Sequence, residues 1–188
     1  YALSSIAIES GNPIYDSRDN CNAIIETATN TLLKGCYNTI IPNTITNIGD
    51  YAFDHCSQLI SITIPNSVTI VGDYAFYFCT SLKSVVIPDD VTYIGNLAFF
   101  YCAALQSLTI GSGVRTLGWN AFDYCYDLKT VICKLVKVPT ESEAYRGIYF
   151  MGTAHADATL YVPMESLEDY KSTYPWNKFG TILPLNQA

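Results

Sequence analysis

Seven cysteines are the side chains of this sequence with the clearest potential for chemistry, because a thiolate is both a nucleophile and a metal ligand. Four of them, Cys56, Cys79, Cys102 and Cys125, follow one another at intervals of 23 residues. A catalytic thiol needs one specific base and is not needed four times. No C-x-x-C pair, the spacing typical of metal sites, occurs. Since free cysteine is among the most buried residue types, the spacing favours a column of reduced, structural thiols.

Disulfide bonds are the alternative that the cysteine pattern leaves open. Such a bond would join repeated cysteines of adjacent units, or would involve Cys21, Cys36 or Cys133. Because seven is an odd number, at least one thiol has no partner within the chain.

Two histidines and one acidic segment complete the candidates for chemistry. His55 lies in the repeated A-F-x-x-C segment, and His155 precedes Asp157 in an irregular stretch where we expect a surface loop. The segment "DSRDN" (16–20) lacks the D-x-D-x-D-G spacing of a calcium loop, and turn formation by short polar side chains explains it. There is no G-x-S-x-G motif and no glycine-rich phosphate loop. We therefore expect that the protein is not an enzyme and that it has no cofactor and no metal site.

The composition and charge of the chain argue against some classes of binding partner. The 188 residues are 49% hydrophobic and 14% charged, which is unlike a disordered chain. The formal net charge is −7 and the ten basic residues are scattered, which argues against binding to nucleic acid or anionic lipid. No apolar run approaches the roughly 18 residues of a membrane helix, so we expect no membrane insertion within this chain.

The 23-residue spacing of the cysteines belongs to an internal repeat. The shared unit reads I-G-x-x-A-F-x-x-C-x-x-L-x-x-[IVL]-x-I-P-x-x-V-x-x. Besides the cysteines, the predicted core columns are Phe53, Phe76, Phe99 and Phe122, and Leu59, Leu82, Leu105 and Leu128. Repeats of this length predict a solenoid, because one unit alone does not bury its apolar face whereas stacked units do.

Each unit reads as one coil of strand, turn, short helical arc and turn. In "LISITIP" (59–65), Ile62 and Ile64 alternate with polar residues, as in a strand with one buried side. Pro65 ends this strand, because proline donates no ladder hydrogen bond. The apolar "DYAF" after Gly49 predicts the helical arc. Stacked strands then form a parallel sheet with a spacing of about 4.8 Å.

The repeated unit "VGDYAFYFCTSLKSVVIPDDVTY" (71–93) resembles the BspA-type leucine-rich repeat, whose hallmark is the A-F-x-x-C-x-x-L-x-x-I-x-I-P pattern. The resemblance is close over residues 41–134, and residues 10–33 and 158–185 resemble the family's flanking segments. It implies a right-handed, curved leucine-rich-repeat solenoid of the α/β class. It also implies export and display on the surface of a host-associated bacterium, with roles in adhesion or protein binding. The family has no catalytic residues to carry over.

We expect one solenoid over residues 1–188, with an expanded N-terminal coil (1–41), four regular coils (42–134) and an irregular coil with a C-terminal cap (135–188). "LSSIAI" (3–8) aligns with the repeat strand, and "NAIIETATNTLL" (22–33) predicts a β-hairpin. The sequence opens without the first half of a repeat, so we expect the natural protein to continue upstream of Tyr1.

The C-terminal segment predicts a cap for the open end of the stack. Residues 137–158 read as an irregular coil, "TLYVP" (159–163) and "TILPL" (181–185) as strands, and "MESLEDYKST" (164–173) as a helix. Leu167, Tyr170 and Tyr174 share one face of that helix. Trp176 and Phe179 supply apolar cover; the alternative is that Trp176 belongs to a binding site.

Two sets of variable positions are candidate binding surfaces. Outward strand positions are small and mostly hydroxylated: Ser61, Thr63, Ser84, Val86, Ser107, Thr109, Thr130 and Ile132. The two positions before each cysteine form aromatic columns: Tyr77, Phe78, Phe100, Tyr101 and Tyr124, with Asp54, His55 and Asp123 in the outer coils. These rings either stack on one another and stabilise the array, or form an adhesive stripe.

The resemblance implies a non-catalytic, secreted or surface-exposed module that binds a protein, such as a host matrix component, and this is the function that we expect. The alternatives are a glycan-binding module that uses the aromatic columns, and an architectural spacer that presents another domain.

Overall fold

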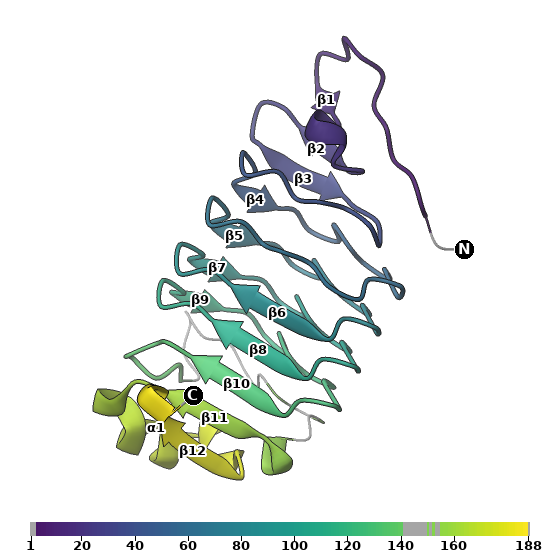
Figure 1. Ribbon diagram of the computed structural model, residues 1–188. Helices are drawn as coiled ribbons and strands as arrows, with labels where there is room; N and C mark the ends of the chain where they lie inside the picture. Colours follow the sequence, from purple (N-terminus) through teal and green to yellow (C-terminus); the bar gives the residue numbers. More distant parts are fainter. Residues whose placement is uncertain (1–2, 141–149, 151, 153–154, 188) are drawn as a thin grey trace.

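The computed structural model describes residues 3–140, 150, 152 and 155–187, and its units stack into one elongated solenoid (Figure 1). Strands of successive regular coils pair in parallel with a register of one repeat, so that Ser84 pairs with Ser107 and Ser107 with Thr130. Each coil therefore places the same side chain over that of its neighbour. The predicted solenoid with a parallel sheet is confirmed.

The longer strands form one all-parallel sheet. In order across it lie β12 (Thr181–Pro184), β11 (Thr159–Val162), β10 (Thr130–Cys133), β8 (Ser107–Ile110) and β6 (Ser84–Ile87). Buried and outward residues alternate along β6, β8 and β10, as a half-buried strand requires. The strand predicted over residues 59–65 is shortened to a single bridge between Ser61 and Ser84.

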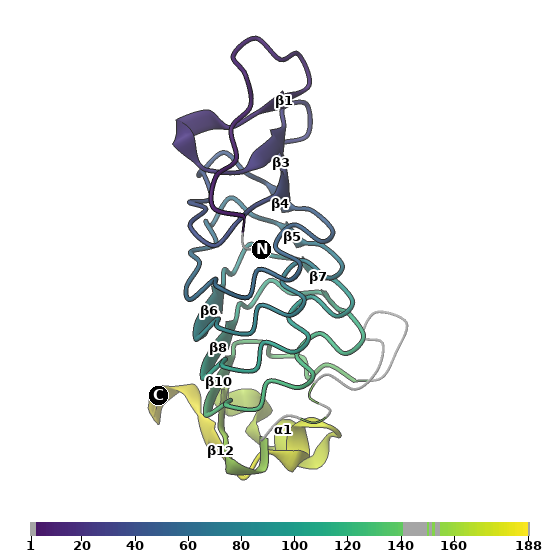
Figure 2. The same ribbon diagram turned by 90° about the vertical axis from the view of Figure 1, so that its right-hand side faces the viewer.

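A second sheet runs along the other side of the stack (Figure 2), whereas the sequence predicted one strand per coil. Its order is β1 (Tyr15–Asp16), β2 (Ile24–Glu26), β3 (Thr31–Lys34), β4 (Asn47–Ile48), β5 (Ile70–Val71), β7 (Tyr93–Ile94) and β9 (Thr116–Leu117). Pairing is antiparallel from β1 to β3 and parallel from β3 to β9. The strands β4, β5, β7 and β9 have two residues each, which is too short for an alternating pattern to reveal them.

The predicted helical arc is wrong: residues 50–55 form consecutive turns. Tyr51 and His55 have positive φ angles of 56°, and the equivalent residues of the next coils do too, which rules out an α-helix. Alternate backbone N–H groups donate to the following coil, from Tyr51 to Asp73 O (3.0 Å) and from Phe53 to Ala75 O (2.7 Å). Each left-handed residue costs about 1–3 kcal/mol. The hydrogen bonds between coils offset that cost.

The repeated glycines lie where two coils come closest. A Cβ atom added at Gly95 would lie 2.5 Å from the backbone nitrogen of Asp73, which is far inside van der Waals contact. Beside the glycines, side chains join the coils: Asp73 Oδ1 accepts a hydrogen bond from the backbone N–H of Asn96 (2.8 Å), and Asn96 Oδ1 accepts one from Trp119 (2.9 Å).

The N-terminal coil differs from the regular ones. β2 and β3 form an antiparallel hairpin, and a short 3₁₀ turn spans Arg18–Asn20. The repeat strand predicted over residues 3–8 is wrong, because those residues form no strand and most are exposed. Their backbone bonds to side chains instead of to a neighbouring strand, as from Ile6 N to Asn22 Oδ1 (2.6 Å).

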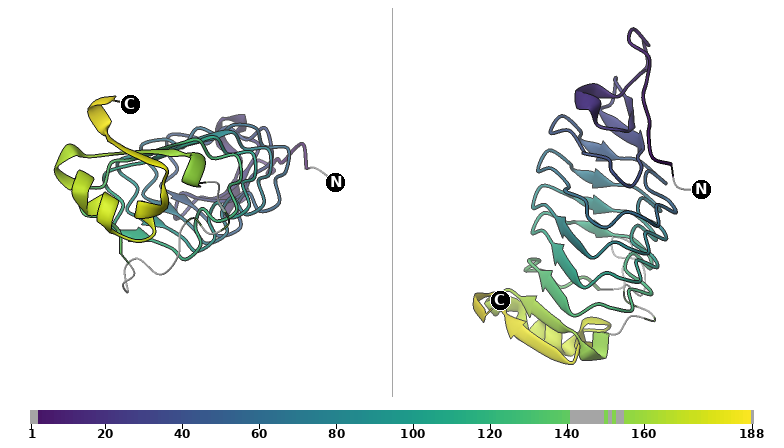
Figure 3. Two further views of the ribbon diagram at one scale, coloured as in Figure 1. Left: turned by 90° about the horizontal axis from the view of Figure 1, so that it is seen from below. Right: turned by 45° about the vertical axis from the view of Figure 1, so that its right-hand side comes forward.

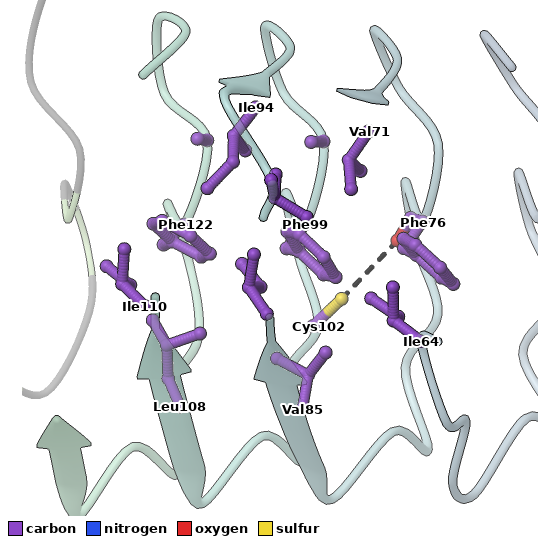
Figure 4. Close-up of a cluster of buried hydrophobic side chains, with 14 of the residues drawn as sticks. Ile64, Val71, Phe76, Val85, Ile94, Phe99, Cys102, Leu108, Ile110 and Phe122 are labelled. Carbon is purple, nitrogen blue, oxygen red and sulfur yellow. Dashed lines mark hydrogen bonds between the residues drawn. The ribbon is translucent and has the colours of Figure 1, made fainter. Parts of the chain in front are cut away.

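A column of phenylalanines runs through the core (Figure 4). Ring centroids are 4.9 Å apart from Phe53 to Phe76 and from Phe76 to Phe99, and 5.4 Å apart from Phe99 to Phe122. Phe150 continues the column at 5.7 Å. The four repeated leucines, Leu59, Leu82, Leu105 and Leu128, are also buried.

The C-terminal segment lies against the last coils (Figure 3). It contains 3₁₀ turns at His155–Asp157, Met164–Ser166, Trp176–Lys178 and Leu185–Gln187, and the helix α1 (Leu167–Ser172). Tyr170 and Trp176 are fully buried and contact each other edge to face, so the alternative that Trp176 lines a binding site is wrong. Tyr174, expected on the same buried face, is 46% exposed because the helix ends at Ser172. Most of the irregular coil predicted over 137–158 lies outside the described residues.

Candidate binding surfaces

The repeated thiols lie inside the stack. Cys79, Cys102 and Cys125 are fully buried, whereas Cys56 is half-buried. The Cys79 thiol donates to the backbone carbonyl of Phe53 at 3.2 Å, and the Cys102 thiol donates to that of Phe76 at 3.3 Å (Figure 4). Cysteine therefore suits this position because it fills a small apolar site and still offers a weak donor. All seven cysteines are free thiols.

The surroundings of these thiols suppress their ionisation. Desolvation by burial raises the pKa of Cys79, Cys102 and Cys125 far above the usual range for a thiol. Burial also raises the pKa of Cys133 to about 11. Because the thiolate is the reactive form, thiols held this way are inert at neutral pH.

The other candidates for chemistry lie apart from one another. His55 Nδ1 lies 2.6 Å from Asp54 Oδ1 on an exposed turn. Asp16 pairs with Arg18 at 2.6 Å, and the hydrogen bond from that guanidinium lowers the pKa of the carboxyl group. Within the part of the chain that the structure describes, no three His, Cys, Asp or Glu side chains gather as metal ligands. The described helices include none long and apolar enough to span a bilayer.

The aromatic columns pack against themselves. Tyr77 stacks on Phe100 with ring centroids 5.2 Å apart, and Phe78 stacks on Tyr101 at 4.5 Å. Tyr124 lies against Tyr101, tilted, at 6.2 Å. All five rings are half-buried, because each ring covers a face of its neighbour. The columns therefore present mainly ring edges to solvent. Asp123, grouped with them from the sequence, is buried instead.

We call the outward face of residues 59–65, β6, β8 and β10 the sheet surface. Ser61, Thr63 and Ser84 are exposed there, whereas Ser107 and Thr109 are half-buried. The sheet surface also carries the aliphatic side chains of Val86, 60% exposed, and Ile60, 57% exposed. Exposed aliphatic side chains that gather on one face can form part of an interaction site, whereas single ones are common on any protein surface.

Two exposed residues of this region, Ile40 and Ile60, were not among the candidates predicted from the sequence. Ile40 is 75% exposed and lies one repeat before Thr63, so the 23-residue period alone would have identified its outward position. Between the coils of Ile40 and Thr63 lies an open pocket of about 570 Å³, lined also by Pro42 and Ser61. The pocket gives the flat sheet surface one concave feature.

A second pocket, of about 640 Å³, opens at the N-terminal end of the turns that carry the cysteines. We call it the N-terminal pocket. Lys34, Cys36, His55 and Cys56 are among its lining residues.

Solved structures of similar fold come from bacterial proteins. The pneumococcal vaccine antigen PcpA matches with a TM-score of 0.71 and 17% identity, over 96% of this chain and 50% of that one. A leucine-rich repeat protein from Eubacterium ventriosum matches with a TM-score of 0.64 and 22% identity, over 96% and 51%. A leucine rich cell surface protein from Faecalibacterium prausnitzii matches with a TM-score of 0.57 and 23% identity, over 95% and 52%. At these identities the likeness establishes the fold alone.

The chain spans about half the length of those three proteins. No curated protein matches it in sequence. A family model described as the BspA type leucine rich repeat region matches six copies of the repeat over residues 29–145, which is more than half of the chain. The chain therefore belongs to the BspA-type leucine-rich-repeat family.

Proposed function

We propose that this protein is a non-catalytic binding module, exported and displayed on the bacterial surface, and that it binds a protein ligand through the sheet surface. The single observation that carries the proposal is the exposure of Val86, Ile60 and Ile40 on a regular scaffold, next to an open pocket that Ile40 lines with Ser61 and Thr63. The Faecalibacterium prausnitzii protein of similar fold is described as a cell surface protein, which supports the proposed location.

Charge and polarity of the sheet surface indicate the kind of partner. Lys83 and Lys129 are exposed immediately before β6 and β10, and the outward positions of these strands carry no acidic residue. The net charge of the whole chain is nevertheless −7. Because Asp89, Asp90 and Asp127 are exposed near the ends of the same strands and Asp19 lines the pocket, the charge there is mixed, and the exposed aliphatic groups favour a partner with apolar side chains. A host matrix protein is the proposed partner class.

The test is a binding assay against immobilised host matrix proteins with paired aspartate variants. Val86→Asp and Ile60→Asp place a charge on the sheet surface, and each should weaken binding about 30-fold or more, as loss of a hot-spot contact of about 2 kcal/mol does. Ile70→Asp is the matched control, because Ile70 is outward and 38% exposed on the other sheet. Equal binding by all three variants and the unmodified protein would contradict the proposal.

A glycan ligand at the aromatic columns is the second candidate. Tyr126 favours a glycan ligand, because its ring is 45% exposed. Its contacts with Tyr101 and Tyr124 are edge to face, so they are not stacked contacts of the kind that a sugar would have to replace. The stacked columns do not favour it, because sugars stack on ring faces and neighbouring rings cover most of those faces. A glycan array with the double variant Tyr101→Ala, Tyr124→Ala separates the two candidates. Binding to neither class would leave the architectural spacer.

A further inference from the structure

The column of thiols ends irregularly on its N-terminal side. Cys79, Cys102 and Cys125 each donate to the carbonyl of a phenylalanine 26 residues earlier. The residue 26 positions before Cys56 is Asn30, which lies in the hairpin turn. The Cys56 thiol consequently has no hydrogen-bond partner among the described residues, and it is the one cysteine that is not buried.

The short N-terminal coil explains this irregularity. β3 pairs with β4 so that Thr31 lies opposite Asn47, a step of 47 − 31 = 16 residues instead of 23. The chain therefore omits the turns that would carry another phenylalanine and cysteine. Gly35 takes the place of the missing ring, since a Cβ atom added to it would lie 2.3 Å from the Phe53 ring.

Because the step from β3 to β4 is shorter than a repeat, Cys36 comes to lie near Cys56, the first cysteine of the thiol column. Gly35, the neighbour of Cys36, donates its N–H to Ala52 O at 2.9 Å, which fixes the backbone of this segment over the turns that lead to Cys56. Cys36 and Cys56 both line the N-terminal pocket, and Cys36 is among the groups whose charge influences Cys56. Cys36 is buried, and its sulfur lies within hydrogen-bond distance of Asn38 Oδ1 (2.9 Å), the backbone carbonyl of Asn22 (3.6 Å) and the Thr39 hydroxyl (3.8 Å).

The other cysteines lack such access. Cys21, Cys79, Cys102, Cys125 and Cys133 are buried, and each thiol has a hydrogen-bond partner, which for Cys21 is the backbone carbonyl of Ala23 at 4.0 Å. A reagent reaches them only if the stack opens. The N-terminal pocket is thus the place in the described structure where a small molecule can meet the half-buried Cys56, with the buried Cys36 also in the pocket lining.

We propose that Cys56 and Cys36 form an oxidisable pair, which a low-molecular-weight disulfide converts into a Cys36–Cys56 bond while the other five cysteines stay reduced. The Cys56 thiolate attacks one sulfur of oxidised glutathione and expels one glutathione. The Cys36 sulfur then attacks the Cys56 sulfur of the mixed disulfide and expels the second glutathione. Two protein thiols are oxidised, one glutathione disulfide is reduced to two glutathiones, and the two thiol protons end on these products.

The experiment treats the folded protein with oxidised glutathione and follows intact mass, with non-reducing peptide mapping. Burial raises the pKa of Cys56 to about 11, so the reaction is run at a pH of about 9 to supply thiolate. We expect a product that has lost two hydrogen atoms, retains no glutathione and links the peptides of Cys36 and Cys56. Its melting temperature should rise, because the bond ties the first coil to the second.

Two variants make the test specific. Cys36→Ser should retain one glutathione on Cys56, because the attacking second thiol is gone. Cys56→Ser should stay unmodified while its circular dichroism spectrum shows that it is folded; if it unfolds, Cys36→Ser alone decides. A persistent glutathione adduct on the unmodified sequence, no reaction at all, or a mapped bond between other cysteines would each overturn the proposal.

Discussion

Removing one ring from the middle of the phenylalanine column should destabilise the whole stack. Phe99 is fully buried, and its ring stacks on Phe76 at 4.9 Å and on Phe122 at 5.4 Å. Replacing a buried phenylalanine by alanine costs about 3–5 kcal/mol through lost burial and the cavity left behind. Each stacked pair contributes about 0.5–1.5 kcal/mol beyond its buried area. Phe99→Ala should therefore lie at the upper end of the 3–5 kcal/mol range.

The end of the column supplies the matched comparison. Phe53 is equally buried but stacks on one ring, Phe76, while Gly35 lies so close to the Phe53 ring that an added Cβ would be 2.3 Å from it. Phe53→Ala should accordingly cost less than Phe99→Ala, by about one stacked pair or 0.5–1.5 kcal/mol.

Urea unfolding followed by circular dichroism measures both free energies, with Tyr126→Ala as a surface control expected within about 0.5 kcal/mol of the unmodified protein. The reasoning is refuted if Phe99→Ala costs less than about 2 kcal/mol, or if Phe53→Ala costs more than Phe99→Ala.

Three further predictions concern the glycines, the buried thiols and the aromatic columns. Gly95→Ala should lower the melting temperature more than Gly49→Ala, since the added Cβ meets Asp73 N at 2.5 Å in the first case and Leu32 O at 3.1 Å in the second; equal effects would argue against close coil contact. The pKa of Cys133 is about 11 when folded, against about 9 when unfolded, so its stabilisation is complete below pH 9 and is lost as pH rises toward 11, by up to about 1.4 kcal/mol per pH unit. In urea titrations over this range Cys133→Val should show a shallower decline, and an unchanged slope would exclude this thiol as a cause. Tyr101→Ala with Tyr124→Ala should lower the melting temperature if the rings mainly stack, whereas unchanged melting with lost ligand binding would support the adhesive stripe.

The 23-residue period was sufficient to predict the solenoid, because a repeat in sequence becomes a repeat in space once coils stack. Phe76, Leu82 and Cys79 recur at equal steps, so a position inside one coil is a position inside the next. The same period predicted that Ser61 and Ser84 face outward, as they do.

Features set by contacts between coils could not be predicted in this way. The residue types Tyr51 and His55 give no hint of positive φ, which arises because their N–H groups bond to the following coil. In the sequence, each strand of the second sheet is marked by only one buried residue, such as Ile48 or Val71, which directly precedes the repeated glycine. One buried residue is too little to predict a strand.

The candidate site was less predictable than the fold, because exposure depends on the irregular first coil. Ile60 stands where the other coils carry Lys83, Gln106 and Lys129, so no apolar column marked it, whereas Ile40 continues the outward column of Thr63 and Val86 into the irregular first coil. The N-terminal pocket likewise exists because β3 pairs with β4 at a shorter step than the regular repeat. That step is set by the hairpin and not by the 23-residue pattern.

The central claim is that equivalent side chains of successive coils lie directly over one another inside the protein. The most direct measurement is the anomalous diffraction of the native sulfur atoms in a crystal. The positions of Cys56, Cys79, Cys102 and Cys125 should form one row with steps of about 4.8 Å, the spacing of adjacent β-strands. Sulfur atoms that are scattered, or sulfur atoms of Cys79, Cys102 and Cys125 that lie at the solvent boundary, would contradict the account.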